Sequence, residues 1–219
     1  MRLGTYFRKE LLDKLNIKTF PEDIVLDVGC FDGYWLSTQK AKEKYGLDLD
    51  IVKKYKDVNY VYGSGLDIPF KNNKFNKVFA FDVIEHLPKN TEVKFLSELI
   101  RTTKFSGEII LTFPSDSIRI WPNFMTNFIS KRWGHYKYLG LSKHQIGKFL
   151  NNFKKIKYEI RDLNTRKYLD YYLILRFLWI LDYKITKSII RKLVKNEVKN
   201  LKGCYGYYLL IITKDEDSV

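Results

Sequence analysis

A short loop bounded by glycines is the first part of this sequence in which the residue types suggest chemistry. The apolar run of residues 24–28 predicts a buried strand, which leads directly into loop residues 29–33 and then into a helix. A dinucleotide fingerprint needs a glycine where Phe31 stands, and Asp27 and Asp32 would repel a pyrophosphate. The loop therefore favours a ligand with a cationic centre and no phosphate, such as an adenosine-containing sulfonium.

Acidic residues also follow the next two predicted strands. Asp48 comes nineteen residues after Gly29, a spacing that places a carboxylate where it accepts hydrogen bonds from both hydroxyls of a ribose. Asp67 is placed to accept a hydrogen bond from an adenine amino group, with Leu66 and Ile68 covering the ring. Taken singly, each acidic residue also fits a helix N-cap or a turn. The ordered set is what points to adenosine.

Alternating strands and helices must position these residues. We expect helices near residues 5–15, 33–44, 50–55 and 91–104, and strands near 24–28, 45–49, 59–62, 77–82 and 108–113. Beyond residue 140 the pattern predicts a helix at 142–152, a strand at 154–162, a long helical region at 165–201 and a last strand at 205–213. Strands that alternate with helices across short loops predict a doubly wound α/β fold.

The composition is that of one folded domain. The chain has 219 residues, of which 45% are hydrophobic and 29% charged, so wholesale disorder is excluded. Cys30 and Cys204 form no CxxC pair, so neither a disulfide framework nor a zinc finger is available. The N-terminal segment lacks the apolar core of a signal peptide, and we expect a cytoplasmic protein.

The net charge of +14 lies on one segment of the chain. Residues 131–202 contain 19 Lys and Arg but five acidic residues, whereas the remainder carries 20 of each sign. A neutral body with a strongly basic segment indicates a surface for an anionic partner, either nucleic acid or a membrane. A general compositional bias of the chain is the alternative explanation, but it does not account for the neutral remainder.

The motifs are similar to those of a known family. Residues 25–33, 45–48, 66–70, 75–87 and 104–114 resemble, in order and spacing, the motifs of class I S-adenosylmethionine-dependent methyltransferases, specifically the type 11 methyltransferase-domain family. The resemblance implies a Rossmann-like, mostly parallel seven-stranded sheet with an antiparallel C-terminal strand. It also implies S-adenosyl-L-methionine as cofactor and S-adenosyl-L-homocysteine as product.

The same resemblance assigns roles to single residues. Asp27 and Gly29 would hold the methionine end of the cofactor, Asp48 the ribose and Asp67 the adenine. Two departures, Asn76 and the run 105–107, fall at turn positions and leave the cofactor assignment intact. The full implied cofactor-binding set is Asp27, Gly29, Cys30, Phe31, Gly33, Asp48, Leu49, Leu66, Asp67, Ile68 and Phe81.

Two histidines are the candidate catalytic bases. His86 lies in the run that follows the fourth strand and is the best-placed candidate base there, although a structural role in bracing that loop is the alternative. Its run, which includes Asp82 and Glu85, is also similar to the metal-binding motif of ubiquinone-pathway O-methyltransferases, but our prediction contains no metal. His135 lies after the fifth strand, where this family builds its acceptor lid, and follows Trp121 and Trp133, one of which we expect to line the acceptor site.

An insertion at residues 164–203, between the last two predicted strands, is the unusual feature of the chain. Its first half, residues 168–183, is strongly apolar but too short and too charged to span a bilayer. Its second half is an amphipathic basic helix. Three interpretations remain open, namely a helix at a membrane interface, a lid or homodimer contact, and a nucleic-acid clamp.

These observations predict a single methyltransferase domain over residues 1–219. We expect methyl transfer from S-adenosylmethionine to a small-molecule or lipid-linked acceptor, with oxygen as the methylated atom and a cytoplasmic, membrane-peripheral location. No tetrapeptide of the kind that grips an exocyclic base nitrogen follows the fourth strand, and no cysteine is placed for attack on a pyrimidine. RNA methylation through the basic segment and a non-catalytic, cofactor-binding adaptor are the alternatives.

Overall fold

Seven strands form one sheet in the computed structural model, which describes residues 2–88, 90–132, 140–198 and 206–215. The strands are β1 (Ile24–Val28), β2 (Glu43–Asp48), β3 (Asn59–Tyr62), β4 (Phe75–Phe81), β5 (Thr103–Pro114), β6 (Ile156–Asn164) and β7 (Gly206–Lys214). Their order is β3-β2-β1-β4-β5-β7-β6. β7 runs antiparallel to both β5 and β6, and all other neighbouring strands are parallel. The predicted fold class is confirmed.

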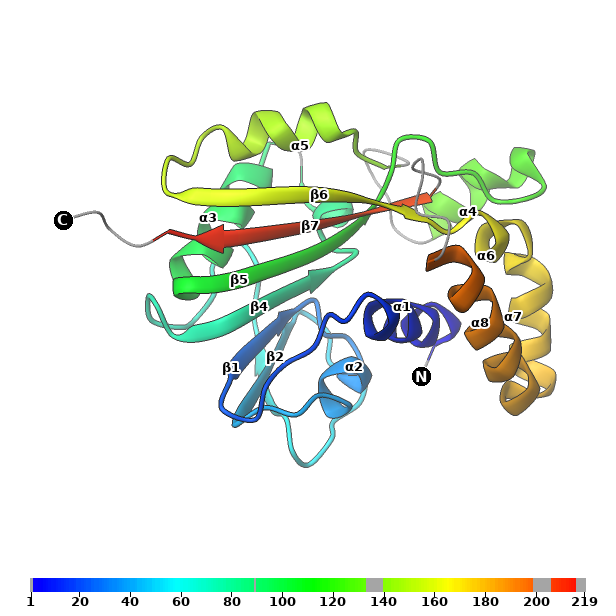
Figure 1. Cartoon of the computed structure of the whole chain (residues 1–219), viewed down its shortest axis with the longest axis horizontal. Coiled ribbons are helices and arrows are strands. Elements are labelled where there is room, and N and C mark those ends of the chain that lie inside the picture. Colours follow the sequence, from blue (N-terminus) through cyan, green and yellow to red (C-terminus); the bar gives the residue numbers. More distant parts are fainter. Residues whose placement is uncertain (1, 89, 133–139, 199–205, 216–219) are drawn as a thin grey trace.

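Helices cover both faces of the sheet (Figure 1). Successive residues of a strand point to opposite faces, so Val25 enters one core cluster and Leu26 the other. The cluster around Leu26 contains residues of α3 (Glu92–Thr102) and α5 (Lys143–Leu150). The cluster around Val25 contains residues of α1 (Leu3–Lys14), α2 (Tyr34–Ser37), α6 (Arg166–Asp170), α7 (Tyr172–Leu181) and α8 (Tyr183–Val198).

Two helix predictions were wrong: one predicted helix is much shorter in the structure, and the other is not formed. The helix expected at 33–44 is the single turn α2, because the hydroxyls of Ser37 and Thr38 hydrogen-bond back to the carbonyls of residues 34 and 35, at 2.7 Å each, and residues 43–48 form β2. The helix expected at 50–55 is absent from this described segment. Its amides bind elsewhere, since Val52 N donates to Phe31 O and Tyr55 N to Tyr60 Oη.

The C-terminal insertion is helical, as predicted, and forms a helical layer together with α1. α8 packs along α1, and α6 and α7 lie against α8 (Figure 1). Tyr168 of α6 stacks on Phe7 of α1 with 3.7 Å between ring centroids, and Trp179 of α7 lies 5.6 Å from Tyr6. These helices stand at the end of the sheet where the parallel strands finish, so they cover the edge at which this architecture places ligands.

The remaining short elements follow β4 and β5. The 3₁₀ helix η1 (Ile84–His86) comes directly after β4, and η2 (Asn123–Met125) with α4 (Thr126–Arg132) follows β5. α5 begins with a reciprocal capping box between Ser142 and Gln145. No helix in the described residues is long and apolar enough to cross a membrane.

Candidate active site

A cavity of about 1050 Å³ lies between the carboxyl ends of the parallel strands and the helical layer. The ends of β1, β2 and β4 supply one wall, through residues such as Gly29, Asp48 and Phe81. The other wall comes from α1, α6 and α7, through residues such as Arg8 and Trp179. A ligand in this cavity would lie with one side against the strand ends and the other against α1 and the insertion.

The loop after β1 requires glycine at its first position. Gly29 has a positive φ of 77°, and a side-chain carbon at this position would lie 2.4 Å from Val83 Cγ2. Only glycine fits that position without strain or displacement. Phe31 also has a positive φ, of 49°, and its ring lies 3.7 Å below the guanidinium carbon of Arg2. The first turn of α1 thus closes over this loop.

The carboxylate of Asp48 is held at the end of β2 by two backbone amides. Its Oδ2 accepts a hydrogen bond from Phe31 N at 2.7 Å, and its Oδ1 accepts one from Asp50 N at 3.1 Å. A carboxylate has about four acceptor sites, so two amide donors leave capacity for two ligand hydroxyls. Asp48 lines the cavity, where these remaining acceptor sites can serve a ribose.

Asp27 is a buried residue of β1, just before Val28 and Gly29, which line the cavity. Only 4% of the residue is exposed, and within the described part of the chain its Oδ1 has no hydrogen-bond partner. Burial raises the pKa of this carboxyl group to about 8, and the nearby Asp48 and Asp32 carboxylates raise it further, while the Arg8 guanidinium opposes the shift. A cationic ligand group would supply the missing partner.

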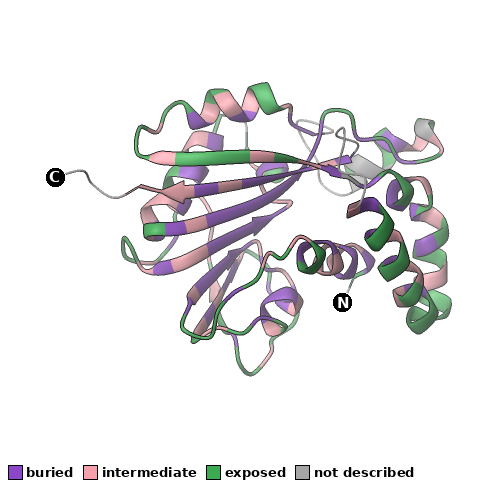
Figure 2. Ribbon diagram, in the orientation of Figure 1, coloured by how far each residue is buried: buried purple, intermediate pink, exposed green. Residues whose placement is uncertain are grey.

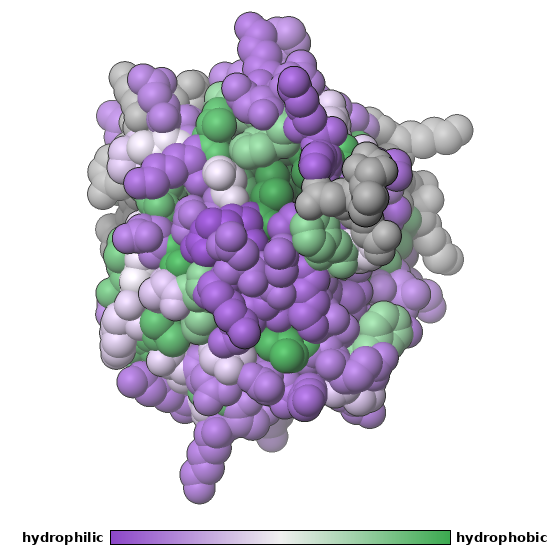
Figure 3. Space-filling model, turned by 90° about the vertical axis from the view of Figure 1, so that its left-hand side faces the viewer, coloured by the Kyte–Doolittle hydropathy of each residue, from purple (hydrophilic) through white to green (hydrophobic). Residues whose placement is uncertain are grey.

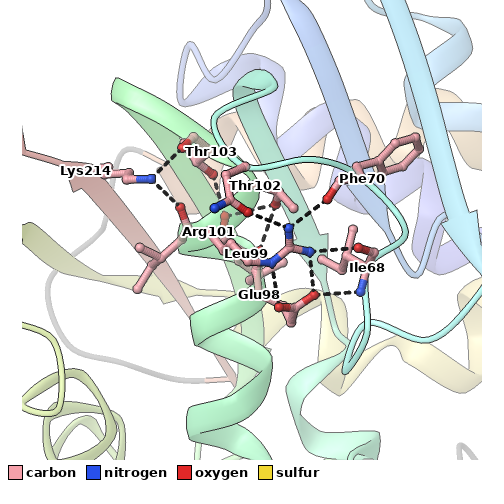
Figure 4. A network of polar contacts seen from close by, with 10 residues as sticks. Ile68, Phe70, Glu98, Leu99, Arg101, Thr102, Thr103 and Lys214 are labelled. Carbon is pink, nitrogen blue, oxygen red and sulfur yellow. Dashed lines mark hydrogen bonds and ion pairs between the residues drawn. The ribbon is translucent and has the colours of Figure 1, made fainter.

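The loop that carries Asp67 is fastened to α3 by one ion pair (Figure 4). Arg101 donates to Ile68 O at 2.8 Å and Phe70 O at 2.7 Å, while Glu98 Oε2 accepts from Ile68 N at 2.7 Å. Arg101 and Glu98 also bind each other, and this hydrogen bond holds the pKa of Glu98 below its usual range. The pair fixes both polar groups of the Ile68 backbone, and thereby the loop.

Replacing Arg101 by methionine is expected to loosen this loop. The change removes the donors to two loop carbonyls, which should cost about 1–2 kcal/mol of unfolding free energy and speed amide exchange at Ile68. Hydrogen exchange followed by mass spectrometry measures both effects. Arg161→Met is the matched control, because Arg161 binds Glu159 on the exposed surface of β6. Equal exchange in the two variants would contradict the role of Arg101.

The floor of the cavity after β4 contains a second group of charged residues. Arg8 of α1 forms an ion pair with Asp82, whose other oxygen accepts from Thr112 Oγ1 at 2.8 Å. Asp82 has a positive φ of 54°, which turns the chain sharply into η1. Glu85, in that 3₁₀ helix, lines the cavity although only 1% of it is exposed.

The carboxyl group of Glu85, on the cavity floor, is buried without a hydrogen-bond partner in the described part of the chain and has a raised pKa. Neither of its carboxylate oxygens has a hydrogen-bond partner among the described residues. Burial raises the pKa of Glu85 well above its usual range, and the Asp82 carboxylate raises it further. Its own backbone amide and the Arg8 guanidinium lower this pKa only in part.

The structure brings together part of the predicted set. The cavity is lined by Gly29, Phe31, Asp48, Leu49, Leu66, Phe81 and His86. Five other residues of the set do not line the cavity: Asp27 is buried near the end of β1, Cys30 and Ile68 are buried in the two core clusters, Gly33 precedes α2, and Asp67 is exposed on its loop. His135 and Trp133 lie outside the described residues, and Trp121 is exposed and is not among the residues that line the cavity.

Sequence reasoning did not anticipate the contribution of the helices to this cavity. Arg8 comes from α1 and Arg2 from the N-cap of that helix, and Tyr168, Tyr172 and Trp179 come from the insertion. The dense aromatic run at 168–183 was visible in the sequence, but no spacing rule connects it with the glycine loop. Among the described residues no group of three or more His, Cys, Asp or Glu is placed to hold a metal ion.

These residues fit an adenosine-containing cation. The unpartnered Asp27 oxygen suits a positively charged group and the Asp48 carboxylate suits a ribose, and Gly29 lines the cavity together with Asp48. Leu66 and Leu49 provide apolar surface for a base.

Comparison with known proteins finds a methyltransferase domain in this chain. Residues 26–111 match the family model described as a methyltransferase domain, type 11. An uncharacterized protein of Methanocaldococcus jannaschii is 32% identical over 91 residues, which cover 40% of this chain and 39% of that protein. The chain therefore matches about two fifths of the length of this curated relative.

Solved structures extend the likeness over the whole fold. A phosphoethanolamine N-methyltransferase of Haemonchus contortus, in complex with S-adenosyl-L-methionine, has a TM-score of 0.66 and 17% identity, covering 95% of this chain and 52% of that chain. An S-adenosylmethionine-dependent methyltransferase of Archaeoglobus fulgidus has a TM-score of 0.60 and 18% identity, covering 94% and 93% of the two chains. At these identities the likeness establishes the fold.

Proposed function

Because the chain carries a class I methyltransferase domain of the type 11 family, we propose that it transfers a methyl group from S-adenosyl-L-methionine to a small-molecule or lipid-linked acceptor. The observation that carries this proposal is the cavity of about 1050 Å³ that Gly29 and Asp48 line together at the strand ends. The volume is at the upper end of the range for small-molecule sites, enough for the cofactor and a second molecule.

The proposed cofactor contacts follow from the positions of the side chains. Asp27 would face the ammonium group of the methionine end, Asp48 the ribose, and Leu66 and Leu49 the adenine, with Asp67 at the loop edge. When bound, the sulfonium supplies an activated methyl group. The protein's own contribution is to align the acceptor and take up its proton. His86, at the rim, and His135 stay candidate bases.

A membrane-peripheral location is supported by the outer face of α7. Phe177 and Ile180 are 63% and 78% exposed, and Ile174 and Leu181 are exposed beside them (Figure 2). Lys192 and Lys195 of the adjacent α8 are also exposed. The opposite end of the molecule, shown in Figure 3, is dominated by hydrophilic residues. An apolar helix face next to basic side chains matches an anionic lipid surface.

The cavity opens beside this apolar face. Arg176, Trp179 and Ile180 of α7 line the cavity, and Arg176 and Ile180 are also exposed. A lipid-linked acceptor held at the bilayer surface would therefore have a short path to the strand ends. We propose that α7 docks on anionic lipid and that the acceptor enters past Ile180.

Charge reversal on α8 is expected to release the protein from anionic vesicles. Each basic side chain near such a surface contributes about 1 kcal/mol, so Lys184→Glu, Lys192→Glu and Lys195→Glu together should weaken binding at least about 100-fold. Cosedimentation with vesicles of phosphatidylserine and phosphatidylcholine measures the partition. The control reverses Lys53, Lys54 and Lys56, three exposed lysines between β2 and β3. Equal losses in the two triple variants would contradict docking through the insertion.

One experiment separates this function from its two alternatives. Calorimetric titration with S-adenosylhomocysteine tests the cofactor site, and transfer of a radioactive methyl group is then assayed against hydroxyl, amine and lipid acceptor panels and against RNA. Turnover with a small or lipid acceptor supports the proposal, whether the methyl arrives on oxygen, as the sequence predicts, or on nitrogen. Turnover with RNA alone would replace it with RNA methylation. Cofactor binding without any turnover would favour the non-catalytic adaptor.

A further inference from the structure

Glu85 is a buried titratable group that the proposed cofactor contacts do not use. It lines the cavity from η1, directly after the β4 strand end, and both of its oxygens lack a partner among the described residues. An ionised carboxyl group buried without hydrogen bonds is strongly destabilising. A ligand that donates hydrogen bonds and carries positive charge would remove this cost.

The charged residues next to Glu85 already interact with other partners. Arg8 forms its ion pair with Asp82, and Asp82 takes its second hydrogen bond from Thr112. Arg8 attracts Glu85 electrostatically but has no hydrogen bond to it in the structure. The pair Arg8–Asp82 is therefore close to neutral, and Glu85 keeps an uncompensated negative charge whenever it is ionised.

Aromatic side chains line the same cavity as this carboxyl group. Phe81, Tyr168, Tyr172, Trp179 and Tyr207 all line the same cavity. The faces of aromatic rings attract cations, and the attraction grows in sites that exclude water. A site with a carboxyl group and aromatic walls should bind an alkylammonium group more tightly than a neutral hydroxyl group.

We propose that Glu85 is the catalytic proton acceptor for an acceptor substrate that carries a primary or secondary amine. This inference rests on the proposed methyl transfer and specifies its substrate class. The ammonium form binds between the Glu85 carboxylate and the aromatic walls and gives one N–H proton to that carboxylate. The freed lone pair then forms the N–C bond to the donor methyl as the C–S bond breaks onto sulfur, which yields a methylated ammonium product and a neutral thioether.

The test uses the full chain saturated with S-adenosylhomocysteine and three probes of matched shape: butylamine, 1-butanol and butyrate. Saturation-transfer NMR and competition titrations measure their binding. We expect butylamine to bind at least tenfold more tightly than either other probe. Glu85→Gln should weaken butylamine binding at least tenfold while S-adenosylhomocysteine affinity changes less than twofold. Glu85→Asp keeps the charge and should retain binding within about threefold of the native protein.

Glu197→Gln is the matched control for a buried carboxyl group. Glu197 of α8 also has an unpartnered oxygen, and burial raises its pKa to about 7, but it accepts a hydrogen bond from Tyr168 N and does not line the cavity. Its butylamine affinity should equal that of the native protein. The pH profile is a second readout, because amine binding should strengthen as Glu85 ionises and be flat in Glu85→Gln over the same range.

Several outcomes would overturn the inference. Equal affinity for butylamine and 1-butanol, or unchanged amine binding in Glu85→Gln, would show that Glu85 does not receive the acceptor. A variant that loses affinity for S-adenosylmethionine but not for S-adenosylhomocysteine would assign Glu85 to the sulfonium instead. Absence of S-adenosylhomocysteine binding to the native protein would contradict the proposed function itself, and that result is distinct from a loss of amine binding alone.

Discussion

Replacement of Asp48 by alanine is expected to weaken S-adenosylhomocysteine binding about 100-fold. The native carboxylate accepts from Phe31 N and Asp50 N and has capacity for two ribose hydroxyls. Hydrogen bonds to a charged group contribute about 1.5–3 kcal/mol each, so losing both ligand bonds costs about 3 kcal/mol or more, equivalent to 100-fold. Isothermal titration calorimetry measures the affinity directly.

A neighbouring carboxylate provides the control for this variant. Asp50 is exposed two residues later, and its amide rather than its side chain binds Asp48. Asp50→Ala should therefore bind S-adenosylhomocysteine within about twofold of the native protein. If both variants lost affinity equally, binding would depend on the total negative charge at the end of β2. Asp48 would then have no ribose contact of its own.

Cofactor affinity is expected to rise about 50-fold between pH 6 and pH 8. The pKa of Asp27 in the free protein is about 8, so the carboxylate form grows from about 1% to about 50% of the protein over this interval. If the cationic end of the ligand pairs with the carboxylate, binding releases the proton and tightens as pH rises. Calorimetry in buffers of different ionisation enthalpy should show about 0.9 proton released at pH 7.

Asp27→Asn isolates this contribution from the titration of the ligand itself. The variant should bind S-adenosylhomocysteine weakly, and its affinity should not show the rise between pH 6 and pH 8 that depends on Asp27. A raised pKa in the folded state also means that the Asp27 contribution to stability is full below pH 3.8 and is lost as pH approaches 8. Asp27→Asn should therefore be more stable than the native protein at pH 8. An identical pH dependence of affinity in both proteins would refute the proposed ion pair.

The sequence was informative wherever local pattern and local chemistry agree. The strand at 24–28, the glycine loop and the acidic residue nineteen positions later are encoded within a short stretch, and the structure aligns Gly29 and Asp48 on one cavity. β-strands buried on both faces read as continuous apolar runs, so the central sheet followed directly. Residues 50–55 show the limit, because the local pattern predicted a helix where the backbone amides instead bind residues outside the segment.

The acceptor side of the site depended on contacts that local pattern does not record. Arg8 and Asp82 are separated by 74 positions, and nothing in the spacing of either residue indicates the other. The insertion was read correctly as helical, but which residues face the cavity follows from how α7 packs on α1. Glu85 was noticed only as a possible metal ligand, since burial without a partner is a property of the folded chain.

The helical layer over the cavity also has a consequence for the order of folding during synthesis. α1 is made first, yet it packs on α8, which emerges from the ribosome about 170 residues later. Contacts between segments so distant in sequence form late and slow the folding of a domain. A ribosome-bound chain that ends before α8 would lack the helix on which α1, α6 and α7 pack, so the cavity wall that these three helices form would be unsupported. Cofactor capture should therefore begin only after α8 has been translated.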